Sequence, residues 1–441
     1  MGERVLFGTD GVRGAVGDVI TADLALRLGR AATLECATRP SRSSERPQVL
    51  VIRDTRESGP MLEAALAAGV ASAGGDAMLG GVLPSPAASI LARRLDFDLA
   101  AVVSASHNPF GDNGVKFFQR SGMKLGGDRE AAIEARLDDP GGGTVGRVRE
   151  LEGALDDYLR ELRTAFQLDL SGLEVVLDCA NGATYRVAPI IFEKLGAKVE
   201  VLSNEPDGRN INEACGATHP EALAERVAAS DATIGFAFDG DGDRVIAVDG
   251  DGTVRDGDEL IALAASHLRD RGELSGGVAV TVMTNFGFHA KMGGEGIDVD
   301  QTKVGDRYVI ESLVERDWNL GGEQSGHIIW TDFTPSGDGI AAALLTLRAL
   351  DGRPLAEVEP FDRLPQLLEN VHIADRSAVD GADALWAAVA EEGAKLEGRG
   401  RVLVRPSGTE PLLRVMVEAP TEEECAEVCA RLVEVVEASL N

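Results

Sequence analysis

The chain has 441 residues, of which 44% are hydrophobic, and it carries a formal net charge of −30. This length suggests two to four domains with buried cores, since a domain spans roughly 100–200 residues. The charge argues against nucleic acid or an anionic membrane as partner, because both are polyanions. No apolar run approaches the ~18 residues that cross a bilayer, and residues 1–11 lack a signal-peptide core, so a cytoplasmic protein is expected.

The acidic residues are spread along the chain and are not collected in a tail. Because salt screens the self-repulsion of such a surface, the composition predicts a halophilic protein, with an ordinary acidic protein as the alternative. The cysteines form no CxxC pair and are interpreted as free thiols in a reducing compartment. They are Cys36, Cys179, Cys215, Cys425 and Cys429.

Strand and helix patterns alternate in three successive segments of similar design. The first segment has strands at 49–54, 77–81 and 99–105, with helices at 58–74 and 85–95. The second has strands at 173–178, 198–203 and 232–239, with helices at 185–197 and 219–230. The third has strands near 276–285, 297–302 and 319–330, with a helix at 307–318. This order predicts parallel α/β units whose chemistry gathers at the carboxyl ends of the strands.

The C-terminal segment has a different order, with helices at 382–396 and 422–440 around two strands within 400–419. The predicted fold class is therefore α/β, with three related α/β domains plus a smaller C-terminal α+β domain. The expected boundaries are 1–150, 151–250, 251–365 and 366–441. A Ser/Pro/Arg-rich stretch at 37–48 is expected to form a surface loop.

The stretch VVSASHNPFGDNGVKFF at 102–118 places Ser106 and His107 at a strand end and Lys116 between apolar residues. A hydrolase with an activated serine would fit, but the G-x-S-x-G elbow is missing. A serine that carries a phosphoryl group is the other interpretation. Lys116 would then move a proton or neutralise the phosphoryl group.

Three aspartates lie at alternate positions, with Asp239 at the end of the strand predicted at 232–239 and Asp241 and Asp243 after it. The glycines between them let the backbone curl so that the carboxylates converge. Such carboxylates repel one another unless a hard cation binds them, and oxygen ligands suit Mg²⁺. The motif indicates phosphate chemistry, with an acidic turn as the alternative.

Two further motifs contain groups that recognise ligands. RPSGTEPLLR, at 405–414, surrounds one turn with guanidiniums, hydroxyls and free N–H groups, which suits a phosphate dianion. GGEQSGH, at 321–327, has Glu323, Ser325 and His327 at alternate positions, so in an extended loop they would share one face and suit sugar hydroxyls. A hairpin and a structural turn are the respective alternatives.

Eight motifs in this order resemble the α-D-phosphohexomutase family. They are FGTDGVRG, SASHNPFGDNGVKFF, LDCANGATYRVAP, CGATHPEAL, FDGDGDR, TKVGDRYV, GGEQSGH and RPSGTEP. The resemblance covers residues 7 to 414 and implies domains arranged around a central cleft. Its amino-sugar subgroup fits best, which implies interconversion of glucosamine 6-phosphate and glucosamine 1-phosphate through a sugar bisphosphate. A glucose or mannose phosphate mutase is the alternative on the same scaffold.

The resemblance also implies a role for each motif residue. Ser106 becomes the phosphoserine nucleophile and also supplies a phosphoserine oxygen to Mg²⁺, one ion per chain. The other metal ligands are Asp239, Asp241 and Asp243, and Arg244 follows them in the active site. The groups beside the reacting phosphate are His107, Lys116 and Arg13. The substrate-binding groups are Lys303, Glu323, Ser325, His327, Arg405, Ser407, Gly408, Thr409 and Arg414.

The implied partners are a hexose phosphate as substrate and a sugar 1,6-bisphosphate as primer, bound by a monomer or a homodimer. The segment RSGMKLGG at 120–127 is interpreted as a surface hairpin. A Mg²⁺-dependent sugar phosphatase and a non-catalytic cation-binding protein stay open as functions of other classes.

Overall fold

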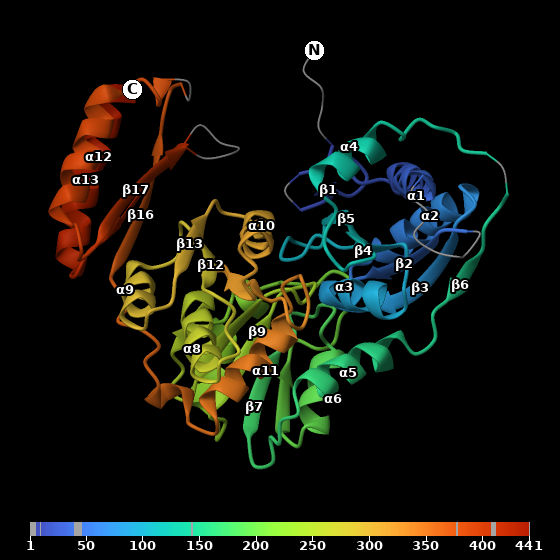
Figure 1. The fold of residues 1–441 in the computed structure, drawn as a ribbon, viewed down its shortest axis with the longest axis horizontal. Coiled ribbons are helices and arrows are strands. Elements are labelled where there is room, and N and C mark those ends of the chain that lie inside the picture. The colour runs from blue at the N-terminus through green and yellow to red at the C-terminus, as the bar shows by residue number, and fades with distance from the viewer. Residues whose placement is uncertain are drawn as a thin grey trace. The chain divides into compact units, whose positions relative to one another are not determined.

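A computed structural model describes residues 6–8, 10–38, 46–142, 144–375, 378–406 and 412–440. The chain divides into two units, residues 1–282 with 300–359, and residues 283–299 with 360–441. Figure 1 shows the helices and strands of both units.

A six-stranded sheet opens the larger unit, with its strands in the order β1-β5-β4-β2-β3-β6. These strands are β1 (Val12–Ala15), β2 (Gln48–Arg53), β3 (Asp76–Val82), β4 (Leu99–Val103), β5 (Asp112–Gln119) and β6 (Val148–Glu150). The helices of this part are α1 (Ala22–Ala37), α2 (Gly59–Ser72), α3 (Ser85–Arg94) and α4 (Gly127–Glu134). β2 is parallel to β3 and β4, whereas β5 is antiparallel to β4 and to β1.

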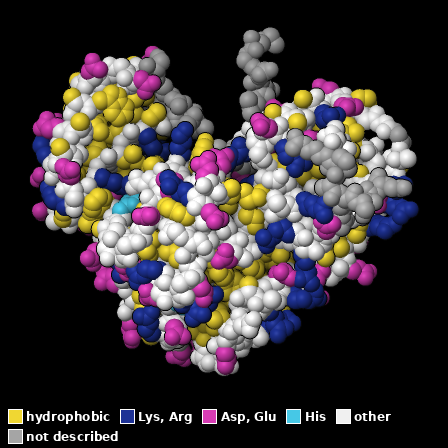
Figure 2. Space-filling model, in the orientation of Figure 1, with side chains coloured by type: hydrophobic (Ala, Val, Ile, Leu, Met, Phe, Trp, Pro, Cys, Tyr) yellow, Lys and Arg dark blue, Asp and Glu magenta, His cyan; other side chains and the backbone are white. Residues whose placement is uncertain are grey.

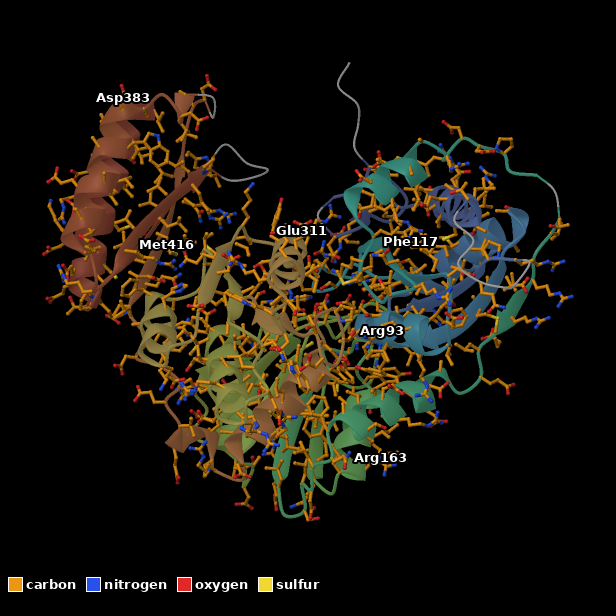
Figure 3. All side chains as sticks on the ribbon, viewed as in Figure 1. Arg93, Phe117, Arg163, Glu311, Asp383 and Met416 are labelled. Carbon is orange, nitrogen blue, oxygen red and sulfur yellow. The ribbon has the colours of Figure 1, made fainter. Side chains whose placement is uncertain are left out.

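The apolar run of β2 is buried on both faces of this sheet. Val49 and Val51 belong to one core with Leu66 of α2 and with Phe117, which is labelled in Figure 3. The alternate residues of β2, among them Ile52, are equally buried and lie on the other face, which α3 contacts. Continuous apolar runs of this kind are typical of strands covered on both sides by helices.

Two smaller sheets complete the larger unit, in the orders β11-β10-β9-β7-β8 and β13-β12-β14-β15. The strands are β7 (Glu174–Asp178), β8 (Lys198–Leu202), β9 (Ile234–Phe238), β10 (Val245–Asp249), β11 (Val254–Arg255), β12 (Val278–Thr281), β13 (Val299–Thr302), β14 (Leu320–Gly322) and β15 (Ile328–Trp330). The helices are α5 (Ala154–Ala165), α6 (Val187–Lys194), α7 (Glu221–Ala228), α8 (Gly257–Asp270), α10 (Asp306–Arg316) and α11 (Gly339–Leu350), with short 3₁₀ turns at Gly216–Thr218 and Leu355–Glu357. The almost wholly apolar helix α11 contacts both β10 and β15, so the two sheets share it.

The smaller unit contains a three-stranded antiparallel sheet in the order β16-β18-β17. Its elements are β16 (Gln366–His372), β17 (Arg401–Pro406), β18 (Leu412–Glu418), α9 (Phe286–Gly294), α12 (Asp383–Lys395) and α13 (Glu422–Leu440). Leu413, Val415 and Val417 of β18 pack in one core with the apolar stripe of α13. The expected α+β arrangement of helices and strands is present here.

The functional motifs occupy equivalent places in the four sheets. Each lies between two adjacent antiparallel strands: β4 and β5, β9 and β10, β14 and β15, and β17 and β18. The prediction of purely parallel units was therefore incomplete. A parallel partner requires a crossover of about a dozen residues, whereas these short motifs close antiparallel hairpins.

All five cysteines lie in described segments, and all of them are free and buried. Within the described segments, no helix combines the length and the apolar character that a bilayer crossing requires. Acidic and basic side chains are intermixed on the face drawn in Figure 2, without one dominant acidic patch.

Candidate active site

Ser106 lies in the loop between β4 and β5 and is 2% exposed. Its φ of +50° is in the left-handed region, which residues with a side chain rarely adopt. Its hydroxyl donates a hydrogen bond of 2.5 Å to Oδ2 of Asp239 and lies 3.4 Å from Nδ1 of His107. The loop thus aims the serine at the aspartates of the second sheet.

A buried arginine, which no sequence motif predicts, holds this loop. Arg56 is fully buried, and its guanidinium donates to the carbonyl oxygens of Ser106 and Asn108 at 2.9 and 2.8 Å. Its counter-ion is Asp54, with Nε 2.9 Å from Oδ2. Asp54 also accepts from the hydroxyl of Ser104 at 2.6 Å, and that hydroxyl accepts from the N–H of Ser106 at 3.0 Å. Arg56 therefore holds the carbonyl oxygen of Ser106 directly, and Asp54 holds the Ser106 N–H through the Ser104 hydroxyl.

The three aspartates converge as the sequence predicts. Asp239, Asp241 and Asp243 are buried, and each offers an oxygen within 4.8 Å of the others. Among the described residues, Oδ1 of Asp241 and Oδ1 of Asp243 have no hydrogen-bond partner. Burial, together with the charges of Asp243 and Asp241, raises the pKa of Asp239 well above its ordinary value. Buried, unpartnered carboxylate oxygens of this kind fit a Mg²⁺ ion.

Gly240 allows the serine loop and the aspartate loop to approach each other. A Cβ at this position would lie 2.6 Å from the carbonyl oxygen of Ser106 and 2.6 Å from Nδ2 of Asn212. Asn212 itself donates to the carbonyl oxygen of Ser106 at 2.9 Å. Any larger residue would therefore separate the nucleophile from the carboxylates.

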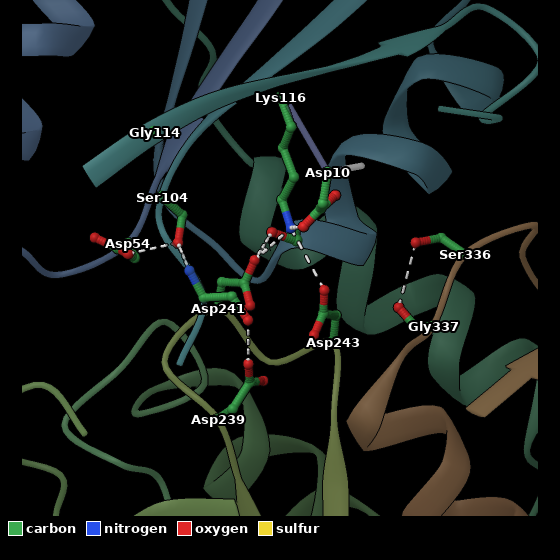
Figure 4. A network of polar contacts seen from close by, with 12 residues as sticks. Asp10, Asp54, Ser104, Gly114, Lys116, Asp239, Asp241, Asp243, Ser336 and Gly337 are labelled. Atoms are coloured by element: carbon green, nitrogen blue, oxygen red, sulfur yellow. Dashed lines mark hydrogen bonds and ion pairs between the residues drawn. The ribbon is translucent and has the colours of Figure 1, made fainter. Parts of the chain in front are cut away.

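Lys116 points from β5 into the carboxylates (Figure 4). Its Nζ lies 2.6 Å from Oδ2 of Asp241, 3.4 Å from Oδ2 of Asp243 and 3.8 Å from Oδ2 of Asp10. Burial opposes the charged form, but Asp10, Asp241 and Asp243 outweigh it and raise the pKa of Lys116 above its ordinary value. Lys116 is therefore held as an ammonium ion.

The predicted arginines and the histidine also lie at this site. Arg13 contacts the carboxylate of Asp10, and Nε of Arg244 lies 4.0 Å from Oδ1 of Asp243. Among the described residues, Nε of each arginine lacks a hydrogen-bond partner. Burial and then the charges of Arg244 and Arg13 lower the pKa of His107 to about 4, so its ring is neutral at pH 7.

The predicted sugar-recognition motif is a tight turn, not an extended loop. Glu323 N–H donates to the carbonyl oxygen of His327, and Gly326 N–H donates to that of Glu323, each at 3.0 Å. Glu323 and His327 are buried, whereas Ser325 is exposed at the tip. The three side chains therefore do not share one face by strand alternation, because the hairpin between β14 and β15 reverses the chain here.

The remaining predicted residues have other surroundings. Lys303 is exposed, with Nζ 5.7 Å from the centre of the Tyr308 ring. In the smaller unit, Arg405 of β17 is paired directly with Arg414 of β18, and burial followed by the charge of Arg414 lowers the pKa of Arg405. Ser407, Gly408 and Thr409 lie outside the described residues.

Several residues at this site were not predicted. Asp10 lies three residues before Arg13 in the FGTDGVRG motif. Its presence in that motif could have marked it as an active-site residue. Ser85 begins α3, donates through its hydroxyl to Asp241, and its N–H donates to the Asp241 carbonyl at 2.8 Å. Lys124 corrects the surface-hairpin interpretation of 120–127: the turn is present, but the lysine side chain is only 19% exposed, because Asp10 and Asp306 bind it.

Four sequence families together match most of the chain. Their descriptions are "Phosphoglucomutase/phosphomannomutase, alpha/beta/alpha domain I" at residues 4–141, domain II at 156–252, domain III at 256–362 and the "C-terminal domain" at 368–435. The chain belongs to the phosphoglucomutase/phosphomannomutase family, the α-D-phosphohexomutases. The predicted class, three α/β domains and a C-terminal domain of an isomerase, is confirmed.

Curated relatives are similar over the whole chain. A phosphoglucosamine mutase of Pelotomaculum thermopropionicum is 48% identical, covering 98% of this chain and 99% of its own. A phosphoglucosamine mutase of Bacillus subtilis is 43% identical, covering 99% of each. The predicted subgroup is thus the one to which these relatives belong.

Solved structures share the fold. A phosphoglucomutase/phosphomannomutase family protein of Burkholderia thailandensis has a TM-score of 0.84 at 26% identity, covering 99% of this chain and 98% of its own. The N-acetylphosphoglucosamine mutase of Aspergillus fumigatus, solved with GlcNAc-6P and magnesium, has a TM-score of 0.71 at 19% identity, covering 100% and 97%.

Proposed function

We propose that this protein interconverts glucosamine 6-phosphate and glucosamine 1-phosphate. The observation that carries the proposal is the contact of the Ser106 hydroxyl with a buried cluster of three aspartates that Lys116 faces. The 48% identical relative named as a phosphoglucosamine mutase supports the amino sugar as substrate. The free cysteines agree with the reducing cytoplasm that we infer as its location.

Asp239, Asp241 and Asp243, with an oxygen of phosphorylated Ser106, would hold one Mg²⁺ per chain. The bound ion would neutralise charge on the phosphoryl oxygens as the phosphoryl group transfers. The magnesium in the Aspergillus fumigatus enzyme supports this choice of metal for the family fold.

The reaction consists of two phosphoryl transfers. In the first, the P–O bond to Ser106 breaks while a bond forms to the free hydroxyl of the sugar monophosphate, which gives a sugar 1,6-bisphosphate. The bisphosphate turns end for end, and its other phosphoryl group returns to Ser106. A sugar 1,6-bisphosphate would also prime an unphosphorylated chain.

The surrounding cations would stabilise the charge of the transferring group. Lys116 favours this electrostatic role over proton acceptance, because its carboxylate neighbours keep it protonated. Arg13 and Arg244 present guanidiniums with unused N–H groups in the described structure. Neutral His107, with Nδ1 3.4 Å from the Ser106 oxygen, is placed to accept the proton of the Ser106 hydroxyl when the phosphoryl group returns to it.

Recognition of the substrate would involve both ends of the sugar phosphate. Glu323, Ser325 and His327 would bind the ring, and Lys303 would contact the substrate. Arg405 and Arg414, with the predicted Ser407, Gly408 and Thr409, would bind the phosphate that does not react. A guanidinium pair suits a phosphate dianion because it offers charge and paired donors.

An assay of products tests the proposal. The protein would receive glucosamine 6-phosphate, glucose 6-phosphate or mannose 6-phosphate, each with Mg²⁺ and a trace of glucose 1,6-bisphosphate, and phosphorus NMR would follow the products. The proposal predicts a 1-phosphate product and the highest kcat/KM with the amino sugar. A preference for glucose or mannose would support the second candidate, a mutase for those sugars. Release of inorganic phosphate alone would support a phosphatase.

A further inference from the structure

A second lysine lies close to Lys116 on the same hairpin. Lys124 forms an antiparallel bridge with Phe118, two residues beyond Lys116 on β5, and the N–H of Gln119 donates to the carbonyl of Met123 at 2.8 Å. Alternate residues of a strand share a face, and paired residues of adjacent strands share it too. Lys116 and Lys124 therefore project from one face of the hairpin.

Lys124 links Asp10, which lies beside the reacting groups, to helix α10, which is far away in the sequence. Its Nζ lies 2.5 Å from Oδ1 of Asp10 and also binds Oδ2 of Asp306. Asp10 lies beside Arg13 and Lys116. Asp306 is the first residue of α10. Its Oδ2 lies 3.8 Å from Nε2 of His327, which belongs to the turn at residues 321–327, here called the sugar turn.

A second ion pair lies next to the pair Lys124–Asp306. In this second pair the cation is on α10 and the anion is on the other segment, which reverses the arrangement of the first pair. Arg307, which follows Asp306, donates to both carboxylate oxygens of Glu130 on α4, at 2.8 and 2.7 Å. The glutamate side chain is 10% exposed and the arginine side chain 27%. We call the pairs Lys124–Asp306 and Glu130–Arg307 the clasp. It binds residues 124–130 to the start of α10.

The clasp connects directly to the sugar turn. Gly305 immediately precedes Asp306, and its N–H donates to Oε1 of Glu323 at 3.0 Å. One carboxylate oxygen of Glu323 is thereby fixed by the backbone at the start of α10. A shift of α10 would move this donor, and with it the carboxylate that would face the ring.

We propose that the clasp determines sugar specificity by positioning Glu323 and His327 relative to Ser106 and Lys116. This inference rests on the proposed function, because it concerns how the same site recognises an amino sugar. Buried polar groups discriminate strongly between substrates only when their geometry is fixed to within about 0.5 Å. Two ion pairs of opposite polarity define one position of α10, since sliding the helix would bring like charges together. The four clasp residues are positioning residues.

Charge reversal in the outer pair tests the inference. Glu130→Arg places two cations together, and Glu130→Arg/Arg307→Glu restores the pair in reverse. We expect Glu130→Arg to raise the KM for glucosamine 6-phosphate about tenfold while kcat changes by less than about threefold, since ring contacts are displaced and the reacting groups are not. Its preference for the amino sugar over glucose 6-phosphate should fall by a similar factor. The double variant should recover both values.

The matched control is the bidentate pair Arg226–Glu200, which lies on α7 and β8 with distances of 2.5 and 2.7 Å. Glu200→Arg should leave KM and preference unchanged. An unchanged KM in Glu130→Arg, or a double variant that does not recover, would overturn the inference. If Glu130→Arg does not fold, Glu130→Gln replaces it, and a wild-type KM in that variant would overturn the inference equally. A wild-type protein that does not convert glucosamine 6-phosphate would instead refute the proposed function.

Discussion

The hydroxyl of Ser106 donates a 2.5 Å hydrogen bond to Asp239, and this contact joins the loop after β4 to the loop after β9. The two residues are 133 positions apart in the chain. Ser106 adopts a left-handed backbone conformation to make the contact, which costs of order 1–3 kcal/mol unless the surroundings impose it. Arg56, Ser104 and Asn212 supply those surroundings through hydrogen bonds to the Ser106 peptide.

Arg56→Met should lower kcat by about 100-fold with little change in KM, because the nucleophile loses its fixed position. It should also lower the free energy of unfolding by about 3–5 kcal/mol, since Asp54 would remain as a buried unpaired charge. Steady-state kinetics and urea unfolding measure the two effects. The control is Arg56→Met/Asp54→Asn, which should regain stability without regaining kcat. If kcat recovers with stability, Arg56 acts only on folding.

Asp241→Asn should weaken Mg²⁺ binding by about tenfold or more, because one of the three carboxylate ligands becomes neutral. Isothermal titration calorimetry measures this affinity directly and does not depend on turnover. Asp300→Asn, which removes an acidic group paired with Arg316 on the surface, serves as the control for net charge. Equal affinities for the wild type and Asp241→Asn would contradict the assignment of the cluster as the metal site.

The stability of the larger unit should depend on the protonation of Asp338. This residue caps α11, accepts from the hydroxyl of Tyr158 at 2.9 Å, and burial raises its pKa to about 6. The neutral carboxyl is favoured in the folded protein, so its stabilising contribution is present below the unfolded pKa of about 4 and is lost as pH rises through about 6.

Asp338→Asn cannot ionise and keeps one acceptor oxygen for the N–H of Ala341. Its NH₂ group replaces the oxygen that accepts from Tyr158, and the Tyr158 hydroxyl can accept from it instead. Relative to the wild type, the variant should gain up to roughly 3 kcal/mol of unfolding free energy between pH 4 and pH 7, from a shift of about two pKa units. Urea unfolding of both proteins across this pH range provides the comparison. Parallel stability curves would show that Asp338 titrates normally in the folded protein.

Much of the site could be predicted because its chemistry lies in short motifs at strand ends. The aspartates converge as expected, since glycines separate them and a buried strand precedes them. Glu323 and His327 were predicted as site residues but with the wrong local geometry. The sequence GGEQSGH suits both an extended loop and a turn, and only pairing of β14 with β15 decides between them.

Arg56 and Lys124 could not be predicted by local pattern. Each is a charged residue in a segment that suggests a surface, and each is buried because its partners come from elsewhere in the chain. Lys124 is bound by Asp10 and Asp306, which are 114 and 182 positions away. Arg56 is surrounded by carbonyl groups of the loop that ends at β5. Burial of such charges follows from tertiary structure, which a single sequence does not display.

Salt should increase activity if the net charge of −30 reflects a halophilic protein. Raising KCl from 0.1 to 1 M shortens the screening length from about 10 Å to about 3 Å, which relieves repulsion across the acidic surface. Thermal unfolding and kcat/KM would be measured over this range, with equal osmolality of sucrose as the control. If kcat/KM and the midpoint of thermal unfolding are the same in dilute buffer as in 1 M KCl, the halophile prediction is refuted.

The most direct measurement is the transfer of radiolabelled phosphate from glucose 1,6-bisphosphate to the protein in the presence of Mg²⁺. We predict label on the peptide that contains Ser106, its removal by glucosamine 6-phosphate with label appearing in the sugar product, and no label on Ser106→Ala, which should remain folded. Label on another residue, equal labelling of Ser106→Ala, or release of the label only as inorganic phosphate would contradict the account of Ser106 as the phosphoryl carrier of a mutase.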